Sequence, residues 1–418
     1  MNEQLLQFIW QHRYFNQSDL HSISGSPLQI IYPGLLNTNQ GPDFLDAKIQ
    51  IDSLMLAGSV ELHIKSTDWQ RHRHQKDIRY SNVILHVVWE YDGLDIPFVQ
   101  VLELKSRVAG SMLSVYEHLM QSASFMPCAP LLSKVNELVW TSWKERLLAE
   151  RMEQRSRVIS QSLERHLGNV EEVFWQILAR SWGMPLNGDV FETLAASLPV
   201  SLLSRYRYRI HQVEALLFGQ AGLLNESFED PYPVMLQKEY LHLKRKHGLQ
   251  QVDGTLRFLR MRPAEFPTVR LAQLAMLIHQ SGFFFSTLKG IESVNDCIRL
   301  FQVTANDFWH RHYTFKQESI YRPKQTGKDT LYRVLINAVI PFLYNQSLAE
   351  GNESLRQRMI GWLFELPPEQ NKWIKEWRQA GVGCKHAFDT QALLELRKNY
   401  CQQKRCLACT IGNVVMRD

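Results

Sequence analysis

The chain has 418 residues, of which 45% are hydrophobic and 21% are charged, values close to the averages of folded soluble proteins. This composition excludes a disordered or fibrous protein, and the length provides for two or three domains with their own cores. The net charge of +5 permits a polyanionic partner, DNA or RNA, without requiring one. The sequence has no signal-peptide pattern and no apolar stretch as long as a membrane span, so we expect a cytoplasmic protein with no membrane partner.

Residues 1–125 combine helical and strand patterns, and we expect them to form a mixed sheet with flanking helices. The predicted elements in chain order are a helix in 2–15, strands at 28–34, 46–52 and 55–65, a helix at 68–80, and strands at 82–89 and 96–104. The segment 82–89, NVILHVVW, is almost continuously apolar, which indicates a central strand buried on both faces. Pro97 at the start of 96–104 indicates an edge strand.

The hydrophobic period changes to that of helices from about residue 135 and stays so to about residue 380, which predicts an all-α domain. Residues 125–134, FMPCAPLLSK, are the expected boundary, and residues 381–418 are expected to form a small cysteine-rich module. The predicted fold class is therefore α+β, with an N-terminal sheet domain, an all-α domain and a C-terminal tail module.

The strand 55–65 carries Glu61, His63 and Lys65 at alternate positions, so the three side chains share one face. The sequence GPDF at 41–44 places Asp43 at the start of the preceding strand, and antiparallel pairing of the two strands brings Asp43 beside Glu61. A solvated face would explain the three polar residues equally well, with Asp43 capping the turn after Pro42.

Two carboxylates from neighbouring strands are suitable ligands for Mg²⁺ or Mn²⁺, and the carbonyl group of Leu62 would be a third. A basic side chain next to them, His63 or Lys65, would activate the attacking water. A Lewis acid, an activated water and a positive charge near phosphate are what metal-assisted phosphodiester hydrolysis needs. Asp43, Glu61, His63 and Lys65 are therefore the candidate catalytic residues.

This arrangement in residues 30–105 resembles the PD-(D/E)xK nuclease superfamily, whose core runs helix, three-stranded meander, helix and strand. In that superfamily an aspartate lies at the second strand and the (D/E)xK motif on the third. Asp43 and Glu61 occupy the acidic positions here, but His63 stands where the motif has lysine, with Lys65 two residues later. The resemblance implies a nuclease-like fold and a Mg²⁺-dependent hydrolase.

Histidines follow the strand closely, and we expect His72, His74 and Asp77 to border the site. A zinc hydrolase site formed by these three residues and His63 is an alternative, although the helical zinc motif HExxH is absent. On a continuous helix His72 and His74 lie about 200° apart, so both reach one metal only if the segment is irregular. His86, within the buried strand, is expected to be a hydrogen-bonded core histidine.

Four of the six cysteines lie in the tail, at Cys384, Cys401, Cys406 and Cys409. The spacing C-x4-C-x2-C and the nearby fourth cysteine predict a structural zinc site or, as an alternative, an iron–sulfur cluster. Cys128 and Cys297 are isolated in the sequence and are expected to pack as small apolar side chains.

Runs of lysine and arginine occur along the helices, and Arg260, Arg262 and Arg270 flank the proline-rich segment RMRPAEFPTVR. Such runs usually form solvated helix faces, but they also suit a groove that follows phosphates. A non-catalytic nucleic-acid-binding or interaction protein, with a structural metal in the tail, is therefore the alternative to a nuclease.

Several blocks of sequence resemble a bacterial family called domain of unknown function 2851. They are PGLLNTNQGPDFLDAKI, GSVELHIKSTDWQRHRHQKDIRYSNVILHVVWEYDG, RMRPAEFPTVRLAQLA and the terminal CxxxxCLACTIGN. The similarity runs nearly end to end, and it implies a family but no reaction, substrate or ligand.

Overall fold

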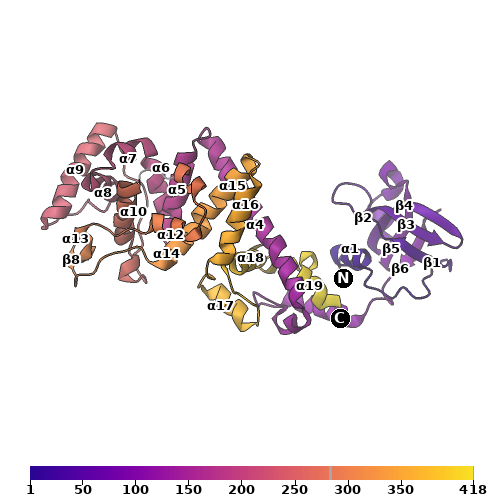
Figure 1. Ribbon diagram of the computed structural model, residues 1–418. Coiled ribbons are helices and arrows are strands. Elements are labelled where there is room, and N and C mark those ends of the chain that lie inside the picture. Colours follow the sequence, from indigo (N-terminus) through magenta and orange to yellow (C-terminus); the bar gives the residue numbers. More distant parts are fainter. Residues whose placement is uncertain (282–284, 418) are drawn as a thin grey trace. The chain divides into compact units, whose positions relative to one another are not determined.

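The computed structural model describes residues 1–281 and 285–417, and it divides into two compact units (Figure 1). Unit 1 contains residues 1–143 and returns at Leu396 for the C-terminal segment, and unit 2 contains residues 144–395. The boundary falls inside the long helix α4 (Glu137–Arg165). Residues 396–417 thus belong to the unit of the sheet and do not form the separate tail module that was expected from the sequence.

Unit 1 is built on a six-stranded mixed sheet with the order β1-β3-β4-β5-β6 and with β2 paired to β3. Its elements are α1 (Glu3–His12), β1 (Leu28–Tyr32), β2 (Leu35–Leu36), β3 (Phe44–Ile51), β4 (Leu54–Lys65), β5 (Val83–Glu90) and β6 (Gln100–Glu103). The pairs β1–β3 and β3–β4 are antiparallel, whereas β4–β5 and β5–β6 are parallel. This confirms the α+β class, the central position of β5 and the edge position of β6.

Both faces of the two central strands are covered. Val60 and Leu62 of β4 are buried on the face toward which α1 packs, and Glu61 and His63 are buried on the opposite face. The register pairs Glu61 with His86 of β5, so these polar side chains share that second face. The polar face of β4 is buried, because residues 66–80 lie over it. The alternative of a solvated polar face is thus wrong for Glu61 and His63.

The predicted helix at 68–80 is wrong in its length. The helix α2 spans only Asp68–Arg71, and two 3₁₀ turns follow at His74–Lys76 and Ile78–Tyr80. Arg73 between them has a φ of 62°, a left-handed conformation that cannot continue an α-helix. The break changes the directions of the side chains on either side of it, so the 200° separation expected on a continuous helix does not apply to them.

The remainder of unit 1 is helical. In it the C-terminal segment packs against the residues that follow the sheet. It comprises α3 (Gly110–Gln121), a 3₁₀ turn at Ala129–Lys134, the start of α4, a π-helical turn at Arg397–Cys401, a 3₁₀ turn at Cys406–Ala408 and α19 (Thr410–Arg417). The helix α19 packs against α3 and the turn 129–134, and Tyr14 hydrogen-bonds to its residue Asn413. The C-terminal segment is therefore an integral part of unit 1.

Unit 2 is a helical domain around one large apolar core, as the sequence predicted. Its helices are α5 (Val170–Gly183), α6 (Gly188–Ser197), α7 (Val200–Tyr206), α8 (Ile210–Gln220), α9 (Pro231–His247), α10 (Pro267–Ser281), α11 (Phe285–Gly290), α12 (Val294–Phe301), α13 (Asp307–His310), α14 (Lys328–Val334), α15 (Ile340–Ala349), α16 (Glu353–Glu365), α17 (Lys372–Gln379) and α18 (Ala387–Leu396). A small hairpin, β7 (His312–Thr314) and β8 (Gln317–Glu318), is the exception to the all-α prediction. Within the described residues, none of the helices combines the length and the apolar character needed to cross a membrane.

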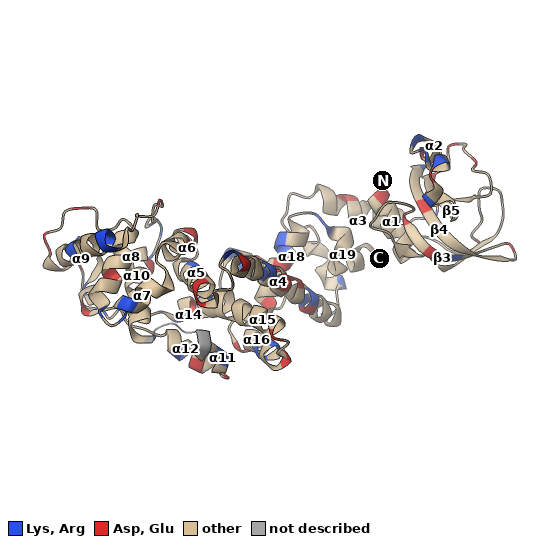
Figure 2. Cartoon of the chain, turned by 90° about the horizontal axis from the view of Figure 1, so that it is seen from above, with Lys and Arg blue, Asp and Glu red and all other residues tan. Residues whose placement is uncertain are grey.

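The basic runs of α4 are mixed with acidic residues in space (Figure 2). Arg146 pairs with Glu150 and Arg157 with Glu153, each one helical turn away on an exposed face. Arg155 instead is half-buried and donates to the carbonyl of Ile336. These arginines of α4 are thus engaged within the protein and do not form a continuous cationic stripe.

Candidate functional site

Asp43 and Glu61 meet at the point where β3 begins beside β4. The N–H of Asp43 donates to Glu61 Oε2 over 3.0 Å, and the N–H of Leu62 donates to Asp43 Oδ2 over 3.0 Å. Gln7 of α1 donates to the other Asp43 oxygen at 2.8 Å. Phe44 pairs with Val60, and Asp43 and Glu61 are the residues next to these two along the chain. The two acids therefore lie side by side, as antiparallel pairing of these strands predicted.

The surroundings of the two carboxyl groups favour their neutral forms. Glu61 is only 5% exposed, and burial together with the charge of Asp43 raises the pKa of Glu61 far above that of an ordinary glutamate. Burial also raises the pKa of Asp43, against the hydrogen bonds from Leu62 and Gln7. Two crowded acids without a positive partner are a feature of functional sites more often than of stabilising cores.

Three histidine rings lie against this pair in a hydrogen-bonded series. The ring of His86 contacts His63 through Nε2 and Nδ1 at 2.9 Å, and the other nitrogen of His63 contacts His72 Nδ1 at 3.1 Å. His63 and His86 are buried, whereas His72 is exposed, so the series runs from the core to the surface. The interior position of His86 agrees with the expectation of a hydrogen-bonded core histidine.

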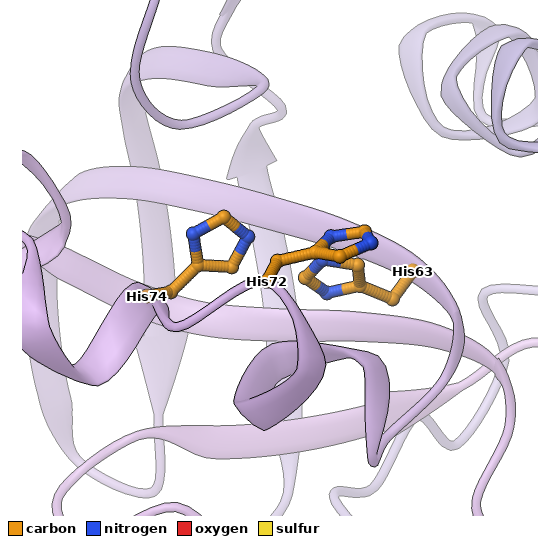
Figure 3. Close-up of side chains that lie close together, drawn as sticks. All are labelled: His63, His72 and His74. Carbon is orange, nitrogen blue, oxygen red and sulfur yellow. The ribbon is translucent and has the colours of Figure 1, made fainter.

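His74 completes a cluster with His63 and His72, whose ligand atoms all lie within 4.8 Å of one another (Figure 3). Its Nε2 is 3.3 Å from Glu61 Oε1 but has no hydrogen-bond partner, and its ring stacks on Tyr80 at 3.9 Å. Burial is the main cause that lowers the pKa of His63 to about 2 and that of His74 to about 4. Both rings are therefore neutral at pH 7 and have lone pairs for a cation.

The other two predicted members of the site point elsewhere. Lys65 is exposed at the end of β4, where its charge interacts with Asp92. Asp77 binds the guanidinium group of Arg79 with both carboxylate oxygens, at 3.0 and 2.5 Å. Asp77 thus neutralises a neighbouring arginine, and Glu61 is the carboxylate that faces the histidines.

The donor set suits a divalent cation. Glu61 and Asp43 offer oxygens, and His74 offers a buried nitrogen that otherwise has no partner. A mixture of carboxylate and imidazole ligands fits Mn²⁺ or Zn²⁺ better than Mg²⁺, which prefers oxygen alone. The structure supplies what the sequence could not show, namely the break at Arg73 that turns both His72 and His74 toward one point.

The tail cysteines are divided between the two units. Cys401, Cys406 and Cys409 belong to unit 1, and Cys384 belongs to unit 2, where its thiol donates to the carbonyl of Val382. All six cysteines of the chain are free thiols. The expected four-cysteine set is therefore not assembled as a sequence-local module.

Unit 2 has a cavity of about 710 Å³ between the proline-rich segment before α10 and the loop before α14. Its cationic lining residues are Arg262, Arg270, Arg322, Lys324 and Lys328, which outnumber the acidic lining residues Glu265 and Asp329. Arg270 and Lys324 are buried, and burial lowers the pKa of Arg270 only to about 10, so it stays charged at neutral pH. This places two of the three arginines that flank RMRPAEFPTVR at one concave surface suited to an anion.

We expect the metal-free protein to be most stable near pH 6.5, because its buried groups titrate in opposite directions. The lowered pKa values of His63, His74 and His86 stabilise the fold above the ordinary histidine value of about 6.5, and this stability is lost as pH falls. The raised values of Asp43 and Glu61 stabilise it below about pH 4, and this stability is lost as pH rises. Thermal unfolding between pH 4.5 and 9 in a chelator measures both limbs, and Mn²⁺ should flatten the alkaline limb. If Mn²⁺ leaves the fall of the melting temperature at alkaline pH unchanged, the proposed cation site is wrong.

A search among curated proteins and a search among solved structures each find no match to the chain. The comparison with family models does find one, and it covers most of the sequence, including the sheet, the histidine cluster and nearly all of unit 2. The match confirms the family resemblance and includes three of the four sequence blocks, whereas the cysteine block at 401–413 lies beyond the matched residues. The chain belongs to the family described as "Protein of unknown function (DUF2851)", whose model matches residues 3–372.

Proposed function

We propose that unit 1 is a metal-dependent phosphodiester hydrolase that acts on nucleic acid. The observation that supports this most is the contact between the half-buried Asp43 and the buried Glu61, where β3 begins beside β4. Burying two acids together destabilises the metal-free fold, so their position calls for a cation as a partner. The order of helix, antiparallel meander and parallel strand around them is similar to that of the PD-(D/E)xK superfamily, but the helix that the superfamily has before its last strand is reduced here to the four residues of α2 and two 3₁₀ turns.

Glu61 and His74, whose Oε1 and Nε2 atoms lie 3.3 Å apart, would hold the cation, Mn²⁺ or Mg²⁺. Asp43 would supply a further oxygen after a shift of its side chain, because the ligand atoms of these three described residues do not all lie within 4.8 Å of one another. When bound, such an ion supplies a Lewis acid next to the phosphate group and lowers the pKa of water. His72, at the exposed end of the histidine series, is placed to accept the proton of an attacking water. His63 holds the His72 ring by its hydrogen bond, and His86 in turn holds His63.

The direct test incubates the purified chain with linear DNA, single-stranded DNA and RNA in the presence of Mn²⁺, Mg²⁺ or a chelator. We expect cleavage with the cations, faster with Mn²⁺ than with Mg²⁺ because of the imidazole ligand, and none with the chelator. Binding of Mn²⁺ is followed separately by the rise in melting temperature. A protein that binds Mn²⁺ but cleaves none of the three substrates would overturn the hydrolase proposal while leaving the cation site in place.

The alternative is a non-catalytic nucleic-acid-binding protein, and the cationic cavity of unit 2 favours it. Replacing the exposed lining residues Arg322 and Lys328 by methionine removes charge without changing the buried wall. If phosphates bind there, the double variant should bind a fluorescent single-stranded oligonucleotide more weakly. Its dependence on salt should also fall, by roughly one unit of slope per lost contact. Unchanged anisotropy titrations would remove the cavity from nucleic-acid binding.

A further inference from the structure

Four cysteines from two distant parts of the sequence line one small cavity in unit 1. They are Cys128, Cys401, Cys406 and Cys409, and the apolar side chain of Leu119 and the ring of Tyr400 close the space around them. Cys128 is about 270 residues away from the others in the sequence, so neither spacing nor motif brings it there. Its position differs from the expectation that it packs as an isolated apolar residue.

Each cysteine lies at the edge of a short helical element. Cys128 directly precedes the turn 129–134, Cys401 ends the π-helical turn, Cys406 begins the next 3₁₀ turn, and Cys409 directly precedes α19. Because α19 packs against the turns 129–134 and 406–408, these ends converge. Helix ends leave backbone N–H groups free to point at sulfur.

The approach of α19 to the loop depends on a glycine. A Cβ atom on Gly412 would lie 2.2 Å from the carbonyl oxygen of Cys406, so no other residue fits without moving the backbone. The backbone N–H groups of Ile411 and Gly412 and the indole of Trp143 lie near Cys409, where they lower the pKa of its thiol against the larger effect of burial. Such N–H contacts to sulfur are characteristic of thiolates that bind metal.

The four thiols are also close enough to act on one another electrostatically. Cys401 interacts with the other three, and Cys128 interacts with both Cys406 and Cys409. All four are reduced. A cavity lined by four free thiols, with Tyr400 and Arg405 beside them, has the donor chemistry of a soft metal site.

We propose that Cys128, Cys401, Cys406 and Cys409 bind one metal centre through four thiolates. On binding, each S–H bond breaks, its proton leaves to solvent, and a sulfur–metal bond forms. Cys384 is not a member: it lies in unit 2, and the charges that act on it are those of Lys144, Arg378 and Asp389.

The spacing of the sulfurs favours an iron–sulfur cluster over a single zinc ion. Four thiolates around zinc lie about 3.8 Å apart, as follows from zinc–sulfur bonds of about 2.3 Å. Within the described chain, the one set of three or more ligand atoms all within 4.8 Å is the histidine cluster, so the cysteines are more widely spaced. In a cluster each thiolate binds a different iron, and the spacing C-x4-C-x2-C is one that clusters use.

The test purifies the full chain without oxygen and measures iron, zinc and sulfide together with the absorbance spectrum. We expect a brown protein with iron and sulfide in equal amounts, and zinc without colour would still establish a four-thiolate centre. Cys128→Ser should lose the metal as completely as Cys406→Ser, whereas Cys384→Ser and Cys297→Ser should keep it. Metal in wild-type protein that survives Cys128→Ser but not Cys384→Ser would overturn the proposed ligand set.

A second measurement keeps the proposal testable if the serine variants do not fold. Alkylation of the native wild-type chain, mapped by mass spectrometry, should leave the four cysteines unmodified while the half-buried Cys384 reacts. Removing the metal with a chelator and mild acid should make all four reactive together. Four thiols that react at different rates, with no metal in the preparation, would exclude the centre. Neither readout depends on cleavage, so this proposal stands or fails separately from the hydrolase.

Discussion

Glu61→Gln is expected to lower cation-dependent phosphodiester cleavage by at least about 100-fold, the size of effect found when one charged or polar group is removed from a preorganised site. The substitution keeps the shape of the side chain and its contact with the Asp43 N–H, but it removes the carboxyl group that would bind the cation beside His74. Initial rates with Mn²⁺ on the best substrate measure the loss. A variant that keeps its rate would remove Glu61 from the mechanism.

The same substitution has an opposite effect on the stability of the metal-free protein. The raised pKa of Glu61 means that the folded protein holds a proton that the unfolded chain releases above about pH 4.5, so folding becomes less favourable as pH rises. Glutamine does not titrate, and the variant should melt at a higher temperature than the wild type at pH 8 in a chelator. Adding Mn²⁺ should raise the melting temperature of the wild type more than that of the variant. Loss of activity with gain of metal-free stability separates a functional acid from a structural one.

Glu90→Gln is the matched control for this pair of experiments. Glu90 ends the neighbouring strand β5, but it is partly exposed and pairs with Lys105 at the surface. An exposed ion pair contributes at most about 1 kcal/mol, so both rate and melting temperature should stay close to wild type. A similar loss of cleavage in Glu90→Gln would show that any change in the sheet disturbs the assay.

The approach of Asp43 to Glu61 was expected from antiparallel pairing, but the exact register was not predictable. The turn between β3 and β4 sets the pairs from Ile51–Leu54 to Ala47–Gly58, and a register shift between Phe44 and Ala47 then moves the pairing by one residue to Phe44–Val60. The burial of Glu61 and His63 was not predictable. The alternation of side chains along a strand indicates which residues share a face, but whether that face is exposed to solvent depends on a covering segment, here residues 66–80.

The histidine cluster was only partly predictable, since it depends on one backbone conformation. Arginine at a φ of 62° has no sequence signal, in contrast to glycine or asparagine, and Arg73 therefore reads as one more helical residue. Cys128 was missed for a different reason. The other three cysteines follow Cys128 only after the whole of unit 2, residues 144–395. No local sequence pattern indicates that two segments so far apart come together.

His63→Gln and Lys65→Gln together decide which basic residue of β4 serves the reaction. The sequence allowed either, but His63 is buried between His86 and His72, whereas Lys65 is exposed at the end of the strand. We expect His63→Gln to lower kcat/KM by about 10- to 100-fold, the usual effect of removing a partner that orients a site residue. Lys65→Gln should stay within about twofold of wild type.

A second readout distinguishes a positioning role of His63 from a loss of folding. If His63 orients His72, its removal should shift the acid limb of the pH dependence of kcat/KM, since the proton acceptor loses its hydrogen bond. Circular dichroism and the Mn²⁺-induced rise in melting temperature should persist, because Asp43, Glu61 and His74 are unchanged. The reverse result, with activity sensitive to Lys65 and insensitive to His63, would mean that substrate binds at the end of β4 near Lys65 and that the buried histidines serve only to hold the cation.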